Sequence, residues 1–110
     1  MTYQHKELAA GRWAKMTLCE QMANIGSEVE RALNWKAKGN SEYSRMAAER
    51  ALELTDLTIE AVKGLARLKE ITRLRESIAD YFFGRNEFNT TGTAMKRYFY
   101  SFGVAARRTI

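Results

Sequence analysis

The chain of 110 residues contains no proline, and this absence constrains its fold more than any other feature of the sequence. Proline and glycine are the residues that most often interrupt helices, and only seven glycines are present. Apolar residues recur at intervals of three or four along most of the chain, which is the period of an amphipathic helix. The sequence therefore predicts a few long helices.

Four helices are predicted, at about residues 6–36, 41–63, 66–83 and 93–107. Gly39 and Asn40 form the first turn, Gly84 ends the third helix, and Thr93 is the predicted N-cap of the fourth. Gly64 separates the second and third helices unless one long helix tolerates a single glycine. Short connections between amphipathic helices favour an all-α fold, an antiparallel four-helix bundle, with residues 1–110 forming a single domain.

The net charge of +5 is concentrated near the C-terminus. Residues 85–110 carry five cations and one carboxylate, Glu87, and so hold four of the five net positive charges. Such a local excess is typical of a surface that binds an anionic partner, such as nucleic acid or a membrane, although a solvated surface can carry the same charge.

The fourth helix is predicted to be amphipathic. A step of about 100° per residue places one set of side chains on the side that faces the core. This set consists of Met95, Tyr98, Phe99, Phe102 and Ala106. Tyr100 lies on the outer side among cations, where it can stack on a base while the cations neutralise phosphates. The candidate nucleic-acid-binding residues are therefore Arg85, Lys96, Arg97, Tyr100, Arg107 and Arg108.

The second helix has apolar residues over an unusually wide arc. Tyr43, Ala47 and Leu54 share one face, whereas Leu52 and Ile59 lie well round from it. A helix of this kind either occupies a central position or contributes to an interface between subunits. Leu52 and Ile59 are the candidate oligomer-interface residues.

Three arginines lie beside apolar positions, namely Arg50, Arg67 and Arg75. A buried guanidinium without a partner costs several kcal/mol, so each of them is expected to pair with a carboxylate or to reach the surface. The outer face of the third helix carries Lys69, Arg73, Glu76 and Asp80, which is typical of a solvated face.

Residues typical of enzymes are sparse. Cys19 is the only cysteine and His5 the only histidine, so no disulfide within the chain, no metal site and no cofactor are expected. The spacing Glu53-Leu-Thr-Asp56 resembles one of the two carboxylate motifs of all-α magnesium-dependent nucleotide pyrophosphohydrolases. The companion Glu-x-x-Glu motif is missing from the sequence, and we expect no enzyme activity.

Residues 21–40, QMANIGSEVERALNWKAKGN, and residues 41–62, SEYSRMAAERALELTDLTIEAV, carry a resemblance to a known group. They resemble the four-helix-bundle proteins of bacterial ribosomal RNA intervening sequences and the accessory variability determinant proteins of diversity-generating retroelements. The resemblance implies a non-enzymatic homo-oligomer. In the retroelement branch it also implies binding to a reverse transcriptase and to nucleic acid, and it supplies no catalytic residues.

The sequence thus predicts a basic, oligomeric helical protein that binds RNA or DNA as an accessory subunit. One alternative is a structural module that binds only another protein through its second helix, and another is binding of the fourth helix to anionic membranes. The N-terminal stretch lacks the apolar core of a signal peptide, and no segment has the roughly 18 apolar residues of a membrane span. A cytoplasmic location without membrane association is expected.

Overall fold

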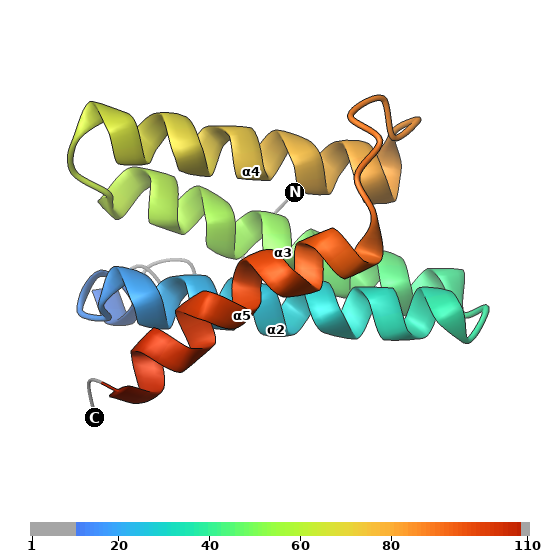
Figure 1. Cartoon of the computed structure of the whole chain (residues 1–110), viewed down its shortest axis with the longest axis horizontal. Helices are drawn as coiled ribbons and strands as arrows, with labels where there is room; N and C mark the ends of the chain where they lie inside the picture. Colours follow the sequence, from blue (N-terminus) through green and yellow to red (C-terminus); the bar gives the residue numbers. More distant parts are fainter. Residues whose placement is uncertain (1–10, 109–110) are drawn as a thin grey trace.

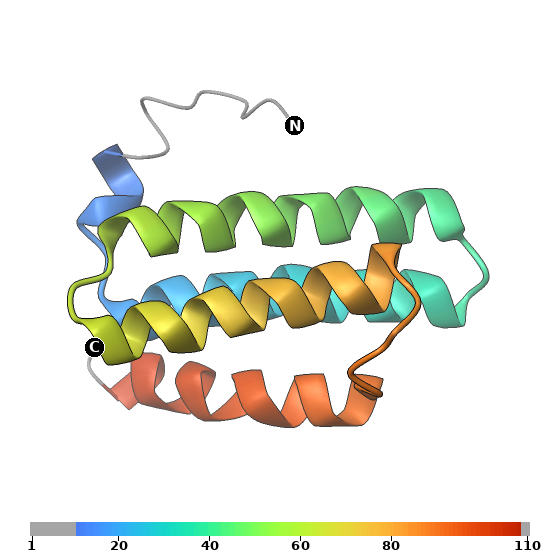
Figure 2. The same cartoon turned by 90° about the horizontal axis from the view of Figure 1, so that it is seen from above.

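The computed structural model describes the backbone of residues 11–108 and the side chains of residues 11–105. All regular secondary structure in this range is helical, which confirms the all-α prediction. The long helices are α2 (Leu18–Ala37), α3 (Ser41–Ala61), α4 (Leu65–Phe83) and α5 (Gly92–Arg108). Successive helices run in opposite directions, and α5 crosses the others obliquely (Figures 1 and 2).

The predicted first helix is interrupted before residue 18. Residues 11–14 form a separate helical turn, and residues 6–10 lie outside the described range. Thr17 begins α2 through a capping box: its hydroxyl accepts from the Glu20 amide at 3.1 Å, and the Glu20 carboxylate accepts from the Thr17 amide at 3.0 Å. The interruption lets Trp13 fold back into the core, where its Nε1 donates to Thr58 Oγ1 at 2.9 Å.

The two tight connections contain glycines with positive φ. Gly39 has a φ of +80° in the turn between α2 and α3, and Asn40 caps α3 by accepting from the Tyr43 amide at 3.0 Å. Gly64 has a φ of +96°, a conformation that favours glycine, and it lies between α3 and α4. The second and third helices are therefore separate, and α3 ends at Ala61 rather than near Lys63.

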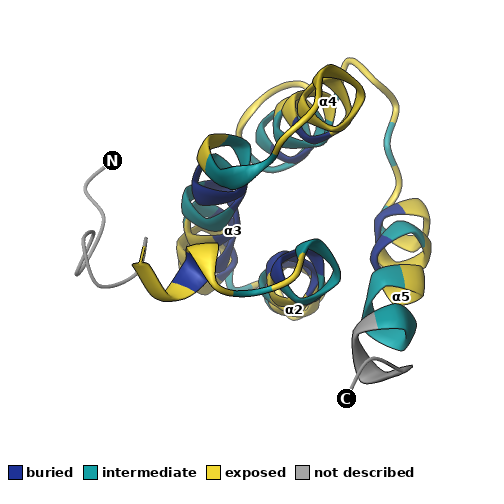
Figure 3. Ribbon diagram, turned by 90° about the vertical axis from the view of Figure 1, so that its left-hand side faces the viewer, coloured by how far each residue is buried: buried dark blue, intermediate teal, exposed yellow. Residues whose placement is uncertain are grey.

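The helices enclose one main hydrophobic core. Helix α2 packs against α3 and α5, and α3 also packs against α4. The most deeply buried residues include Met22, Ile25 and Val29 of α2 and Ile71 and Ile78 of α4. Buried residues line the inward sides of the helices when the molecule is viewed end-on (Figure 3). The side between α4 and α5 is packed less closely than the others in the described part of the chain.

None of the helices in the described range is both long enough and apolar enough to cross a membrane. Each instead has a polar side, so that the surface is charged and the apolar residues are largely directed inward. This separation of polar and apolar sides is what sets the orientation of the candidate site on α5.

Candidate nucleic-acid interface

The inner side of α5 contains the predicted aromatic residues. Met95 and Phe99 are buried, and Tyr98 and Phe102 are partly buried against the same core. Tyr98 contacts both phenylalanine rings, with centroid distances of 5.2 Å to Phe99 and 5.5 Å to Phe102. The predicted orientation is thus confirmed for these four residues, whereas the side chain of Ala106 lies outside the described range.

The outer side of α5 presents Tyr100, which is 69% exposed, together with Lys96 and Arg97, which are both exposed. Neither cation forms an ion pair with any carboxylate in the described part of the chain. Arg107 and Arg108 lie at the end of the α5 backbone, but their side chains are outside the described range. Lys96, Arg97 and Tyr100 are therefore the described members of the candidate site on this helix.

Arg85 is exposed on the loop that leads into α5. Asp80 shapes this loop, because its two carboxylate oxygens accept from the amides of Glu87 at 2.8 Å and Phe88 at 3.1 Å. The loop is held further by the Thr90 amide, which donates a hydrogen bond to the side-chain oxygen of Asn86 at 2.9 Å. Asp80 is thus a loop-capping residue rather than a member of a solvated face.

Two asparagines of the same loop, Asn86 and Asn89, have a φ of 53° each. Asparagine adopts this left-handed conformation more readily than most residues, so the loop has turn residues where it needs them. The loop ends at Thr91, whose hydroxyl accepts from the Ala94 amide at 3.0 Å. Thr91 rather than Thr93 therefore caps α5, and the helix begins at Gly92.

Two carboxylates of α2 lie near the candidate site. Glu20 and Glu30 line a groove of about 400 Å³ between α2 and α5, and Lys96 and Tyr100 line the same groove. Hydrogen bonds from the backbone and side chain of Thr17 lower the pKa of Glu20, which keeps this carboxylate ionised near neutral pH. A phosphate is repelled from the groove itself, so the outward side of α5 is the favourable position for an anion.

A second group of cations and aromatic rings lies at the end of α2. The Lys36 ammonium is 4.2 Å from the centroid of the Tyr81 ring, and the Lys38 ammonium is 5.2 Å from that of Trp35. Tyr43 packs edge-on against Trp35 and is 49% exposed. Lys36 and Lys38 are not among the binding residues predicted from the sequence, because their contacts with Tyr81 and Trp35 depend in part on the packing of α2 against α4.

The two candidate interface residues of α3 contribute to the interior of the chain. Leu52 is 5% exposed and belongs to the main core, and Ile59 is partly buried against that core. The wide apolar arc of α3 follows from its position between α2 and α4, which cover it from two sides. The assignment of Leu52 to an interface between subunits is therefore not retained, whereas that of Ile59, which is partly exposed, stays a prediction.

Each of the three arginines that lie beside apolar positions either pairs with a carboxylate or reaches the surface, as predicted. Arg75 of α4 forms two hydrogen bonds with the carboxylate of Asp56 on α3. Arg67 pairs with Glu70 of its own helix at 3.1 Å, and Arg50 is exposed. Of these three arginines, Arg75 is the one whose ion pair among the described residues links two helices.

The arrangement of carboxylates on α3 does not form a metal site. Residues 11–105 contain no group of three or more histidine, cysteine, aspartate or glutamate side chains placed to hold a metal ion. Burial, followed by the charge of Glu49, raises the pKa of Glu53. Asp56, which completes the Glu53-x-x-Asp56 spacing, is paired with Arg75.

Comparisons with models of protein families, with curated proteins and with solved structures find no match for this chain. The outer side of α5 is the most distinctive surface that the described residues form. It combines exposed cations with an exposed aromatic ring on one helix.

Proposed function

We propose that this protein is a non-enzymatic, basic helical bundle that binds RNA or DNA through the outer side of α5. In this proposal the four long helices act as an antiparallel four-helix bundle that holds α5 with its cations outward. The observation that carries the proposal is the exposure of Lys96, Arg97 and Tyr100 on one side of the helix, without ion pairs among the described residues.

The chemistry of these residues suits a phosphate backbone with unstacked bases. Cations that are not committed to a carboxylate can release the counterions of a nucleic acid, which is the main source of such affinity. An exposed tyrosine supplies a face on which a base can stack, worth about 1–3 kcal/mol per base. Arg85 on the preceding loop and Lys36 and Lys38 at the end of α2 provide further positive charge.

Fluorescence anisotropy with a labelled single-stranded RNA oligonucleotide tests the proposal at salt concentrations from 50 to 200 mM. The logarithm of the affinity should fall linearly with the logarithm of the salt concentration. The double variant Lys96→Gln and Arg97→Gln should reduce the slope of that line by about 1.4, since each phosphate contact to a single strand contributes about 0.7. Tyr100→Ala should weaken binding about tenfold at every salt concentration.

A matched control removes the same number of charges from another helix. Arg50 on α3 and Lys63 just after it are exposed, and α3 lies on the other side of the molecule from α5 (Figure 3). The variant Arg50→Gln and Lys63→Gln should keep the wild-type salt slope. If both double variants change binding equally, net charge rather than the α5 site is responsible, and the proposal fails.

The resemblance in residues 21–62 extends the proposal to partners. On that basis we propose that the protein is a homo-oligomer and an accessory subunit of a reverse transcriptase of the diversity-generating retroelement type, acting in the cytoplasm as the N-terminal sequence predicts. Co-purification of the chain with the reverse transcriptase encoded nearest to its gene, before and after nuclease treatment, tests this part. Loss of the complex after nuclease treatment would mean that nucleic acid bridges the two proteins and that no direct contact exists.

A further inference from the structure

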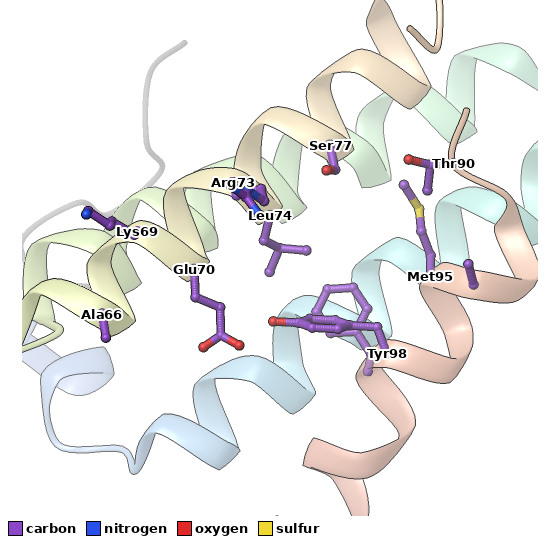
Figure 4. A pocket seen from close by; sticks show the side chains of 11 residues that line it. Ala66, Lys69, Glu70, Arg73, Leu74, Ser77, Thr90, Met95 and Tyr98 are labelled. Atoms are coloured by element: carbon purple, nitrogen blue, oxygen red, sulfur yellow. The ribbon is translucent and has the colours of Figure 1, made fainter. Parts of the chain in front are cut away.

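A groove lies between α4 and α5, on the side where these helices are packed less closely. Its volume is about 480 Å³, which is within the range of small-molecule pockets and well below the space that a docked helix needs. Leu74 of α4 and Met95 and Phe99 of α5 contribute its apolar wall. Figure 4 shows Glu70 and Leu74 of α4 directed across this space toward Tyr98 of α5.

One polar group in the groove lacks the partner that its burial requires. The Tyr98 hydroxyl is buried and has no hydrogen bond of normal geometry among the described residues. It points toward the carboxylate of Glu70 across the groove (Figure 4), and Glu70 itself accepts a hydrogen bond from Arg67 at 3.1 Å. A buried hydroxyl without a partner is costly, so a ligand that supplies an acceptor at this point gains affinity.

The charges along the α4 edge select the type of ligand. Lys69 and Arg73 line this edge and form no ion pair with carboxylates in residues 11–105. Arg67 offsets part of the negative charge of Glu70, which leaves two cations, Lys69 and Arg73, against one paired carboxylate. Positive charge therefore predominates beside an apolar wall, an arrangement that favours an apolar molecule with one acidic group.

We infer that the groove between α4 and α5 binds a small amphipathic anion. The apolar body of the ligand packs against Leu74, Met95 and Phe99, its acidic group lies near Lys69 and Arg73, and an acceptor on the ligand takes the hydrogen bond of the Tyr98 hydroxyl. Nothing in this site uses Lys96, Arg97 or Tyr100, so it is separate from the proposed nucleic-acid surface.

Two fluorescent probes with nearly the same rings separate the charge from the apolar body. 8-Anilinonaphthalene-1-sulfonate carries one sulfonate, and N-phenyl-1-naphthylamine lacks it. The native protein should bind the sulfonate at one site and about tenfold more tightly than the neutral probe. Changing Lys69 and Arg73 to glutamine should remove most of this preference, and Tyr98→Phe should weaken sulfonate binding about fivefold, as expected for one hydrogen bond.

A bulky side chain at the edge of the groove provides the steric test. Ala94 is exposed and lines the groove, whereas its neighbour Thr93 is exposed and does not. Ala94→Trp should abolish binding of both probes, and Thr93→Trp should leave it unchanged, with circular dichroism verifying that both variants are folded. Equal binding of the two probes, unchanged binding by Ala94→Trp, or full affinity of Tyr98→Phe would each overturn the inference.

Discussion

Gly26 of α2 sets the distance at which α5 packs, and replacing it by alanine is the most direct test of this packing. Gly26 is buried against α5. A Cβ atom at this position would lie 2.6 Å from the Cβ of Phe99 and 2.8 Å from its Cγ. Rotation of the Phe99 ring cannot relieve the closer contact, because a Cβ atom is fixed to the backbone. The two helices would have to move apart.

The magnitude follows from two opposing effects. Alanine is favoured over glycine inside a helix by about 1 kcal/mol, which on its own would stabilise α2. Ordinary contacts of a Cβ atom begin near 3.4 Å, so α5 must move by roughly 1 Å, and a gap of that size forfeits a quarter to a half of the dispersion energy of the contacts involved. Overpacking of this kind costs about 3 kcal/mol. We expect Gly26→Ala to lower the free energy of unfolding by about 2 kcal/mol.

Urea denaturation followed by circular dichroism at 222 nm measures this change. With a urea dependence of about 1–2 kcal/mol per molar for a chain of this size, the midpoint should fall by about 1 M or more. The control is Ser27→Ala, an exposed position next to Gly26 whose hydroxyl donates to the Ala23 carbonyl of its own helix at 3.1 Å, and it should change the midpoint little. A Gly26→Ala variant that is as stable as the wild type, or more stable, would refute the packing of α5 described above.

Two further predictions concern Tyr98 and Asp80. Burial, followed by the charge of Glu70, raises the pKa of Tyr98 to about 12, so an absorbance titration at 295 nm should contain one late tyrosine transition that Tyr98→Phe removes. Since this pKa is raised from 10.0, the contribution of Tyr98 to stability is intact below pH 10 and is lost as the pH rises toward 12. Asp80→Ala should cost about 1–2 kcal/mol and accelerate tryptic cleavage after Arg85, because the amides of Glu87 and Phe88 lose their acceptor. An exposed residue of the same helix, Glu76, should tolerate alanine, and slow cleavage in both variants would contradict the role of Asp80.

The sequence was sufficient to predict the helix ends that lie at a glycine or an asparagine. Gly39, Gly64 and Gly84 each lie at a helix end, as the sequence indicates, because the positive φ of the first two is a local property of the chain. The interruption before α2 was not predicted. Its local signal, the Thr17–Glu20 capping box, is weak on its own, and the contact that accompanies it joins Trp13 to Thr58, 45 residues away.

The orientation of α5 was also predictable, because it depends only on the helical period. Phe99 is 6% exposed and its neighbour Tyr100 is 69% exposed, as a turn of 100° per residue requires. The burial of Leu52 by other helices of the same chain was not predictable in the same way. A helical wheel shows that an arc is apolar, but only the arrangement of α2 and α4 around α3 determines that the same chain covers it.

The proximity of Glu20 and Glu30 to Lys96 likewise depends on the packing of α2 against α5. The same packing lets Gly26→Ala distinguish the two proposed sites. Phe99 lines the groove between α4 and α5, so a displacement of α5 should alter the affinity for the arylsulfonate probe. Lys96, Arg97 and Tyr100 are exposed and all belong to α5, so they move together with the helix and their mutual geometry is preserved. RNA affinity should therefore stay close to that of the wild type while probe binding changes, and a parallel loss of both would mean that RNA binding also depends on how α5 packs against α2.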